Sequence, residues 1–73
     1  MVKVDSSMID SLGYDEKGET LHVKFKNGGV YTYQDVPPEK YQALLAADKD
    51  PKQSVGGHFG KTIKGKYKHE RAD

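Results

Sequence analysis

The sequence predicts an α+β domain in which a three-stranded antiparallel β-meander is covered on one face by two C-terminal helices. Two observations predict this class. Between residues 7 and 34, apolar residues alternate with polar ones and glycine-containing turns separate the segments, as in half-buried strands. Between residues 36 and 67, the apolar spacing lengthens to three or four residues, which is typical of amphipathic helices.

Three segments are expected to form the meander. They cover residues 7–15 (SMIDSLGYD), residues 20–26 (TLHVKFK) and residues 30–34 (VYTYQ). The second segment has the clearest signal, because apolar side chains occupy every second position: Leu21, Val23 and Phe25. The NGG sequence at 27–29 predicts a hairpin turn between the second and third strands.

Two helices are expected after the meander. The first covers roughly residues 38–47, since Pro38 suits a first helical turn and Pro51 blocks continuation. Its apolar face consists of Tyr41, Leu44 and Leu45. The second helix covers residues 54–67, with Ser54 as the N-cap and four glycines that weaken it. Its apolar stripe recurs every four residues: Val55, Phe59, Ile63 and Tyr67.

The GGHFGKT sequence at 56–62 is similar to a phosphate-binding loop, G-x-x-x-x-G-K-[ST]. The spacing fails, because the position five residues before Gly60 is Val55, and Gly56 leaves the loop one residue short. Only eleven residues follow Thr62, too few for the long helix and metal-binding residue that such a loop requires. We therefore expect no binding of ATP or GTP.

The composition is that of one small domain, spanning residues 1–73 with a core at 7–67 and a tail at 68–73. There is no cysteine and no long apolar run, so we expect a monomeric cytoplasmic protein without disulfides or a membrane segment.

The net charge is distributed unevenly along the chain. Residues 1–50 have a net charge of −3, whereas residues 51–73 have six basic and two acidic side chains, a net charge of +4.

Several short motifs follow one another in a specific order. They are Gly-Tyr-Asp at 13–15, L-x-V-x-F at 21–25, Y-x-Y at 31–33, V-P at 36–37 and F-x-x-x-I-x-x-x-Y at 59–67. Together they resemble the KTSC domain family over residues 7–67. That family is a module at the C-terminus of some lysyl-tRNA synthetases and is also found in stand-alone small bacterial proteins. The DKDPKQ and VGG segments depart from the family pattern, in which the link before the last helix is often shorter.

The register of the predicted hairpin decides where Tyr31 and Tyr33 lie. With a three-residue NGG loop and a left-handed Gly29, Phe25 pairs with Tyr31 and both tyrosines join the core. With a two-residue loop, both rings lie beside the lysines of the second strand and form a basic stacking platform. We favour the core arrangement because the chain is short of apolar residues, and keep the platform as the alternative.

The candidate binding surface is the basic C-terminal segment: Lys61, Lys64, Lys66, Lys68 and Arg71. On a helix, Lys64, Lys68 and Arg71 would follow one flank, where they could track a phosphate backbone. The same charges could also be only a solvated surface. With the family resemblance, this pattern predicts a non-catalytic module that binds RNA, for example tRNA. The alternative is a protein-interaction or accessory module without nucleic-acid contact.

Other chemistry has little support in the sequence. The three histidines, His22, His58 and His69, lack a companion at metal-ligand spacing, so we expect no metal and no cofactor. No spacing of Ser, His and Asp favours a catalytic set, and a domain of this size has little room for a substrate pocket. We therefore expect no enzymatic activity.

Overall fold

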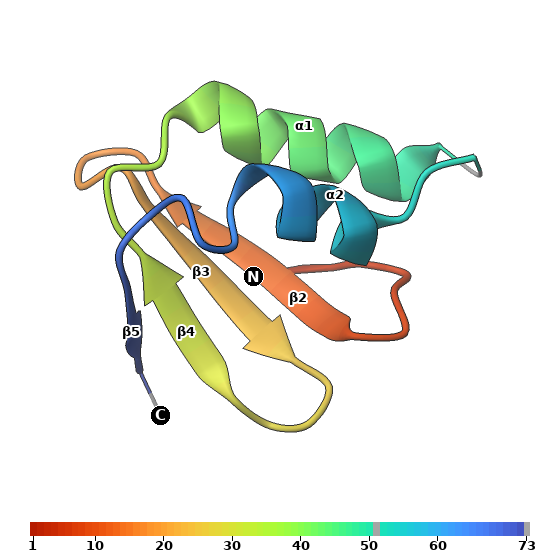
Figure 1. Ribbon diagram of the computed structural model, residues 1–73, viewed down its shortest axis with the longest axis horizontal. Helices are drawn as coiled ribbons and strands as arrows, with labels where there is room; N and C mark the ends of the chain where they lie inside the picture. Colours follow the sequence, from red (N-terminus) through yellow and green to blue (C-terminus); the bar gives the residue numbers. More distant parts are fainter. Residues whose placement is uncertain (51, 73) are drawn as a thin grey trace.

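The computed structural model describes residues 1–50 and 52–72. The elements follow in the order β1 (Val2–Lys3), β2 (Ile9–Asp15), β3 (Thr20–Phe25), β4 (Val30–Tyr33), α1 (Pro38–Lys49), α2 (Val55–Thr62) and β5 (His69–Arg71). The strands form one antiparallel sheet in the order β1-β2-β3-β4-β5. Both helices lie on the same face of this sheet (Figure 1). The predicted α+β class and the two helices are confirmed, but the sheet has five strands rather than three.

The two additional strands lie at the edges of the sheet. β1 has two residues and β5 has three, and all five are exposed. β5 lies within residues 68–73, the segment expected to be a tail. Backbone hydrogen bonds attach it to β4 at both ends: the N–H of Gln34 donates to the carbonyl of Lys68 at 2.9 Å, and the N–H of Ala72 donates to the carbonyl of Val30 at 2.7 Å.

The first helix agrees with its prediction. α1 begins at Pro38, the expected first-turn residue, and Pro37 before it is extended, with φ −63° and ψ 150°. The helix ends at Lys49, where the N–H of Asp50 donates to the carbonyl of Ala47. Pro51, the expected stop signal, lies outside the described residues.

The second helix begins as predicted but ends earlier. The Ser54 hydroxyl caps its first turn by accepting a hydrogen bond from the N–H of Gly57 at 3.2 Å. α2 ends at Thr62, so the prediction of a helix continuing to Tyr67 is wrong. Gly65 takes a left-handed conformation with φ +80°, and this conformation redirects the chain toward β5.

The β3–β4 hairpin has a three-residue loop, one position earlier than predicted. The N–H of Phe25 donates to the carbonyl of Gly29 at 2.8 Å, and the N–H of Gly28 donates to the carbonyl of Phe25 at 3.0 Å. The loop therefore consists of residues 26–28. Gly28, not Gly29, takes the positive φ, of 101°.

This change moves the strand pairing by two residues. Tyr31 lies opposite Val23, and Tyr33 lies opposite Leu21, instead of the predicted partners Phe25 and Val23. A shift of two residues keeps every side chain on its predicted face, because the side-chain period of a strand is two. Both tyrosines therefore face the helices, so the predicted face is confirmed although the predicted pairing is wrong.

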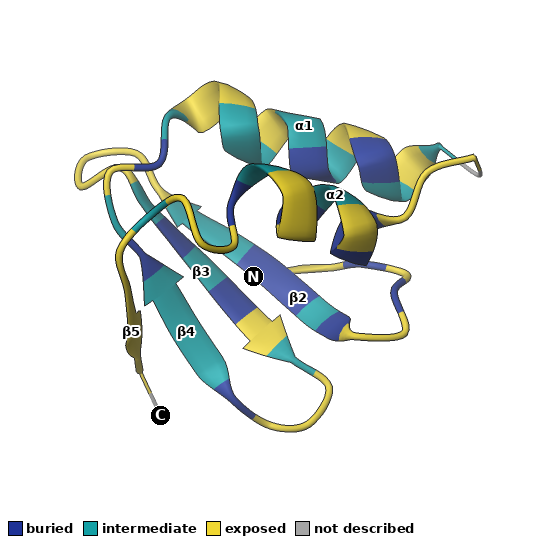
Figure 2. Ribbon diagram, in the orientation of Figure 1, coloured by how far each residue is buried: buried dark blue, intermediate teal, exposed yellow. Residues whose placement is uncertain are grey.

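The buried residues lie on the strands and helices that face one another (Figure 2), and their side chains form one core cluster. Its largest fully buried side chains come from β2, β3, the segment before α1, both helices and the residue after α2: Ile9, Leu12, Leu21, Val23, Val36, Leu44, Val55, Phe59 and Ile63. Ile63 is buried although it lies beyond the end of α2, so the four-residue apolar spacing continues past the helix itself.

Candidate functional site

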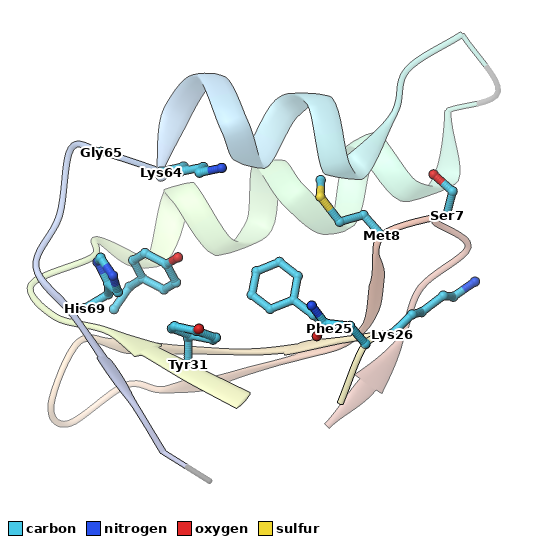
Figure 3. A pocket seen from close by; sticks show the side chains of 10 residues that line it. Ser7, Met8, Phe25, Lys26, Tyr31, Lys64, Gly65 and His69 are labelled. Atoms are coloured by element: carbon cyan, nitrogen blue, oxygen red, sulfur yellow. The ribbon is translucent and has the colours of Figure 1, made fainter. Parts of the chain in front are cut away.

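A cavity of about 570 Å³ lies on the helix-covered side of the sheet, beside the end of α2 (Figure 3). Its residues come from three parts of the chain: the segment before β2, the β3–β4 hairpin, and the segment from the end of α2 to β5. The end of α2 contributes to this site, because Lys64 and Gly65 follow the helix directly and line the cavity. The hairpin end of the sheet extends beyond both helices (Figure 1).

Aromatic rings form the sheet side of the cavity. The ring of Tyr31 lies on β4, and that of Phe25 meets it edge-on, with centroids 5.6 Å apart and planes at 82°. His69 of β5 also lines the cavity, with its ring centroid 5.9 Å from that of Tyr31. The ring of Phe25 also packs edge-on against Phe59 of α2, at 5.9 Å, so the aromatic surface is attached directly to the core.

The two tyrosines differ in exposure. Tyr33 is buried, with 5% of its surface exposed, and its ring packs edge-on against Phe59 at 5.3 Å. Burial raises the pKa of the Tyr33 phenol, with a smaller contribution from Tyr31. Tyr31 is only half-buried: it packs against the core and also lines the cavity. Its ring is therefore accessible from the helix side, not from the lysine face that the alternative register would have used.

The polar lining of the cavity favours an anionic ligand. Lys26 lies at the hairpin and Lys64 follows the end of α2, and both are exposed. Figure 3 shows the Lys64 side chain reaching over the aromatic rings. Asn27 also contributes to the lining, and its Oδ1 accepts a hydrogen bond from the N–H of Gly29 at 3.0 Å. The described lining residues include no Asp or Glu, so the fixed charges at the cavity are positive.

The five predicted basic residues are all exposed, but they do not share a helical flank. Only Lys61 belongs to α2, so the predicted alignment of Lys64, Lys68 and Arg71 on one helix is wrong. Lys61 lines a smaller hollow of about 240 Å³ together with Lys52, and it is not among the residues of the main cavity. Lys66 lies in the turn after α2, where its N–H donates to the carbonyl of Ile63.

Strand pairing brings another basic residue to the helix side of the sheet. Arg71 lies directly opposite Tyr31, and residues directly opposite in an antiparallel pair project to the same face. Lys68 precedes β5, and its carbonyl accepts the N–H of Gln34. The structure thus places Lys64 and Arg71 near the aromatic surface, whereas Lys61 lies at the other hollow.

Sequence reasoning gave no binding role to several residues of this cavity, among them His69, Asn27 and Met8. His69 was assigned to a tail, Asn27 to a turn, and Met8 to the first predicted strand, although Met8 precedes β2 and is 47% exposed. The three-residue strand that carries His69 contains no apolar residue, so it has no periodic signal. For Asn27 the sequence did contain a usable signal. The NGG turn predicts a hairpin loop, and such a loop places its asparagine at the end of the sheet, where the cavity lies.

The GGHFGKT segment does not form a phosphate-binding loop. Residues 56–62 lie inside α2, so their backbone is helical and does not form a loop. The N–H of His58, for example, donates to the carbonyl of Ser54 at 2.8 Å.

Across residues 1–50 and 52–72, no three His, Asp or Glu side chains gather in a way that could hold a metal ion. Neither described helix is long and apolar enough to cross a membrane.

Comparison with known proteins identifies several similar chains. The family model of the KTSC domain matches residues 5–67. An uncharacterized protein of Stutzerimonas stutzeri is 44% identical over 73 residues, covering 99% of this chain and 96% of that protein. A lysine–tRNA ligase of Nostoc punctiforme is 39% identical over 71 residues, which cover 97% of this chain but 12% of the ligase. The crystal structure of a KTSC domain protein from Yersinia pestis superposes with a TM-score of 0.87, at 34% identity and with coverage of 97% and 93%.

Proposed function

The chain belongs to the KTSC domain family, and from this premise we propose that it is a small non-catalytic module that binds RNA through its basic C-terminal segment. The observation that carries the proposal is the exposure of every basic side chain that the sequence analysis assigned to residues 61–71. Exposed Lys and Arg side chains on one short segment can contact successive phosphates of a nucleic-acid strand.

The relatives supply a second, weaker support. The same module occurs in lysine–tRNA ligases, whose name states that they act on a tRNA. The matched region is 12% of the Nostoc punctiforme enzyme, so the chemistry of that enzyme is not attributed to this chain. A module attached to such an enzyme is well placed to hold RNA, and a stand-alone copy could do the same with other RNA molecules.

The test is a titration of a fluorescent single-stranded RNA at low salt, followed by fluorescence anisotropy. Reversing three charges together, Lys64→Glu, Lys68→Glu and Arg71→Glu, should abolish binding. The matched control reverses three lysines outside the segment, Lys17→Glu, Lys40→Glu and Lys49→Glu, with the same change in net charge. The control should retain most of the affinity, because the proposal assigns the phosphate contacts to residues 61–71.

Salt dependence gives an independent measurement. Each phosphate contact to a single strand should contribute roughly 0.7 to the log–log slope of affinity against salt. Variants that lose contacts should therefore show flatter slopes as well as weaker binding. An absence of wild-type binding at low salt, or an equal loss of binding in the two triple variants, would contradict the proposal.

A protein-interaction module remains the second candidate, and one observation favours it. Large apolar side chains are exposed near the N-terminus: Met1 at 64%, Val2 at 48% and Met8 at 47%. Such side chains can anchor a protein partner. Association with a protein through them would tolerate salt, whereas RNA binding would weaken steeply, so the same salt series distinguishes the two functions.

A further inference from the structure

We propose that the cavity beside the end of α2 takes up one unstacked base of a bound RNA strand, with the neighbouring phosphates at Lys26 and Lys64. This inference rests on the proposed RNA-binding function and adds a subsite for a nucleobase. The basic segment alone accounts only for contacts to the strand's backbone. The cavity offers the three properties that a base with its phosphate requires: a flat aromatic surface, sufficient volume and positive charge.

The aromatic surface is formed by two perpendicular rings. Tyr31 and Phe25 meet at 82° and form a corner on the helix side of the sheet. A planar base that stacks on one ring would meet the other edge-on, and both arrangements are favourable between aromatic rings. Because Tyr31 packs partly against the core, its ring is held in place before a ligand arrives.

The volume and position of the cavity suit a single base. At about 570 Å³, the cavity lies within the range of roughly 300–1,000 Å³ that is typical of small-ligand sites. It lies between the sheet and the segment after α2, so a base inside it could not pair in a duplex. This geometry selects single-stranded RNA, whose bases can turn outward and stack on aromatic side chains.

The charges around the rings are suited to phosphate. Lys64 reaches over the aromatic surface from the end of α2, whereas Lys26 lies at the hairpin and extends outward from the other end of the cavity (Figure 3). Oδ1 of Asn27 is engaged by the N–H of Gly29, which leaves the side-chain NH₂ group as a donor for an acceptor atom on a base edge. The described lining residues contribute no carboxylate that would repel a phosphate.

The test compares two strands of roughly ten nucleotides that differ only in their bases. One is ordinary single-stranded RNA, and the other has abasic spacers at every position, so that the phosphates remain and stacking is impossible. At about 50 mM salt, wild-type protein should bind the ordinary strand roughly tenfold more tightly than the abasic one. The Tyr31→Leu variant keeps apolar packing without an aromatic ring, and it should bind both strands with the affinity that wild type shows for the abasic one.

Two further variants separate a loss of stacking from a loss of fold. Tyr31→Phe retains the ring and should bind as wild type does. Tyr41→Leu makes the same change on α1, at a residue outside the cavity lining, and should keep the full preference for bases. The melting temperature and amide spectrum of each variant establish that it is folded.

The outcomes separate the subsite from the proposed function. Equal affinity of wild-type protein for the two strands would overturn the subsite and leave the phosphate-binding function standing. An unchanged preference for bases in Tyr31→Leu would also overturn the subsite. No binding of either strand at low salt would overturn both. Loss of the preference in Tyr31→Leu alone, with shifts of the Lys26, Tyr31 and Lys64 amides in wild type, would support the subsite.

Discussion

The imidazole of His69 stacks on the phenol ring of Tyr33, with the ring centroids 5.3 Å apart and the planes at 29°. Tyr33 is a buried residue of β4, whereas His69 begins the exposed edge strand β5. The two lie directly opposite each other in the sheet. This contact joins the last strand to the core, although no residue of that strand is itself buried.

Removing the stack should therefore loosen β5 without unfolding the domain. In His69→Ala, we expect the amide hydrogens of Gln34 and Ala72, which bond across β4 and β5, to exchange roughly two- to tenfold faster. Hydrogen exchange followed by NMR measures this change. Glu70→Ala is the control, because Glu70 projects to the other face of the same strand. Wild-type exchange rates in His69→Ala would show that the stack does not hold the strand.

Alkaline pH should reduce stability through Tyr33. Burial raises the pKa of this phenol above its usual value of 10.0, so the folded protein keeps the proton at a pH where the unfolded chain loses it. The contribution is fully present below pH 10 and is lost as the pH rises through the higher folded pKa. Tyr33→Phe should show a shallower fall in urea midpoint between about pH 8 and about pH 11.

Tyr14 provides an internal comparison for the same experiment. Burial, together with the charge of Glu19, raises the pKa of the Tyr14 phenol too, and its hydroxyl donates to the carbonyl of Val36 at 2.6 Å. Some alkaline destabilisation should therefore remain in Tyr33→Phe and diminish further in the double variant with Tyr14→Phe. A pH profile identical in wild type and both variants would exclude the phenols as its cause.

The GGHFGKT segment should give no response to nucleotides. Residues 56–62 are helical, and the N–H groups of Gly57 and His58 already donate to the hydroxyl and the carbonyl of Ser54, so this backbone cannot encircle phosphate groups. Titration with ATP or GTP and magnesium, followed by NMR, should leave the amides of 56–62 unshifted at sub-millimolar concentration. Magnesium-dependent shifts confined to these amides would contradict the prediction that the segment binds no nucleotide.

Two glycines five residues apart should respond oppositely to the same substitution. Gly60 lies inside α2 and Gly65 has φ +80°, and a methyl group added at either meets no atom within 4 Å. Steric contact therefore cannot explain a difference between them. Gly60→Ala should stabilise the fold by about 1 kcal/mol through helix propensity. Gly65→Ala should destabilise it by roughly 1 kcal/mol, because alanine disfavours the left-handed region. Urea denaturation of the two variants measures both effects, and changes of the same sign would refute this explanation.

Local periodicity was sufficient to predict the central part of the fold. The strands β2, β3 and β4 each have four or more residues, and α1 has proline at its start, so their patterns were visible in the sequence. The hairpin register was wrong by two residues, yet the faces were correct, because a shift of two conserves alternation. The edge strands β1 and β5 depend on pairing with their neighbours, which no local pattern of two or three residues reveals.

The candidate site was harder to predict because it depends on where a helix ends. The four-residue apolar spacing from Val55 to Tyr67 suggested one continuous helix, but the chain leaves it after Thr62 and still buries Ile63. Gly65 was interpreted as a residue that weakens the helix. In the structure it lies beyond the helix end, and its left-handed conformation turns the chain away from the helix. Because the helix is shorter than predicted, Lys64 lies at the cavity and not on a helical flank, and residues 69–71 form a strand.

The short edge strands also affect how molecules of this protein meet one another. A sheet edge presents unpaired backbone groups, and a long apolar edge would recruit strands from other molecules into fibrils. Here an incoming strand would find only two residues of β1 or three of β5, and it would have to approach Lys3 on one side or Glu70 and Arg71 on the other. Such edges are poor templates for amyloid growth or strand exchange, so the brevity of β1 and β5 protects the sheet in concentrated solution.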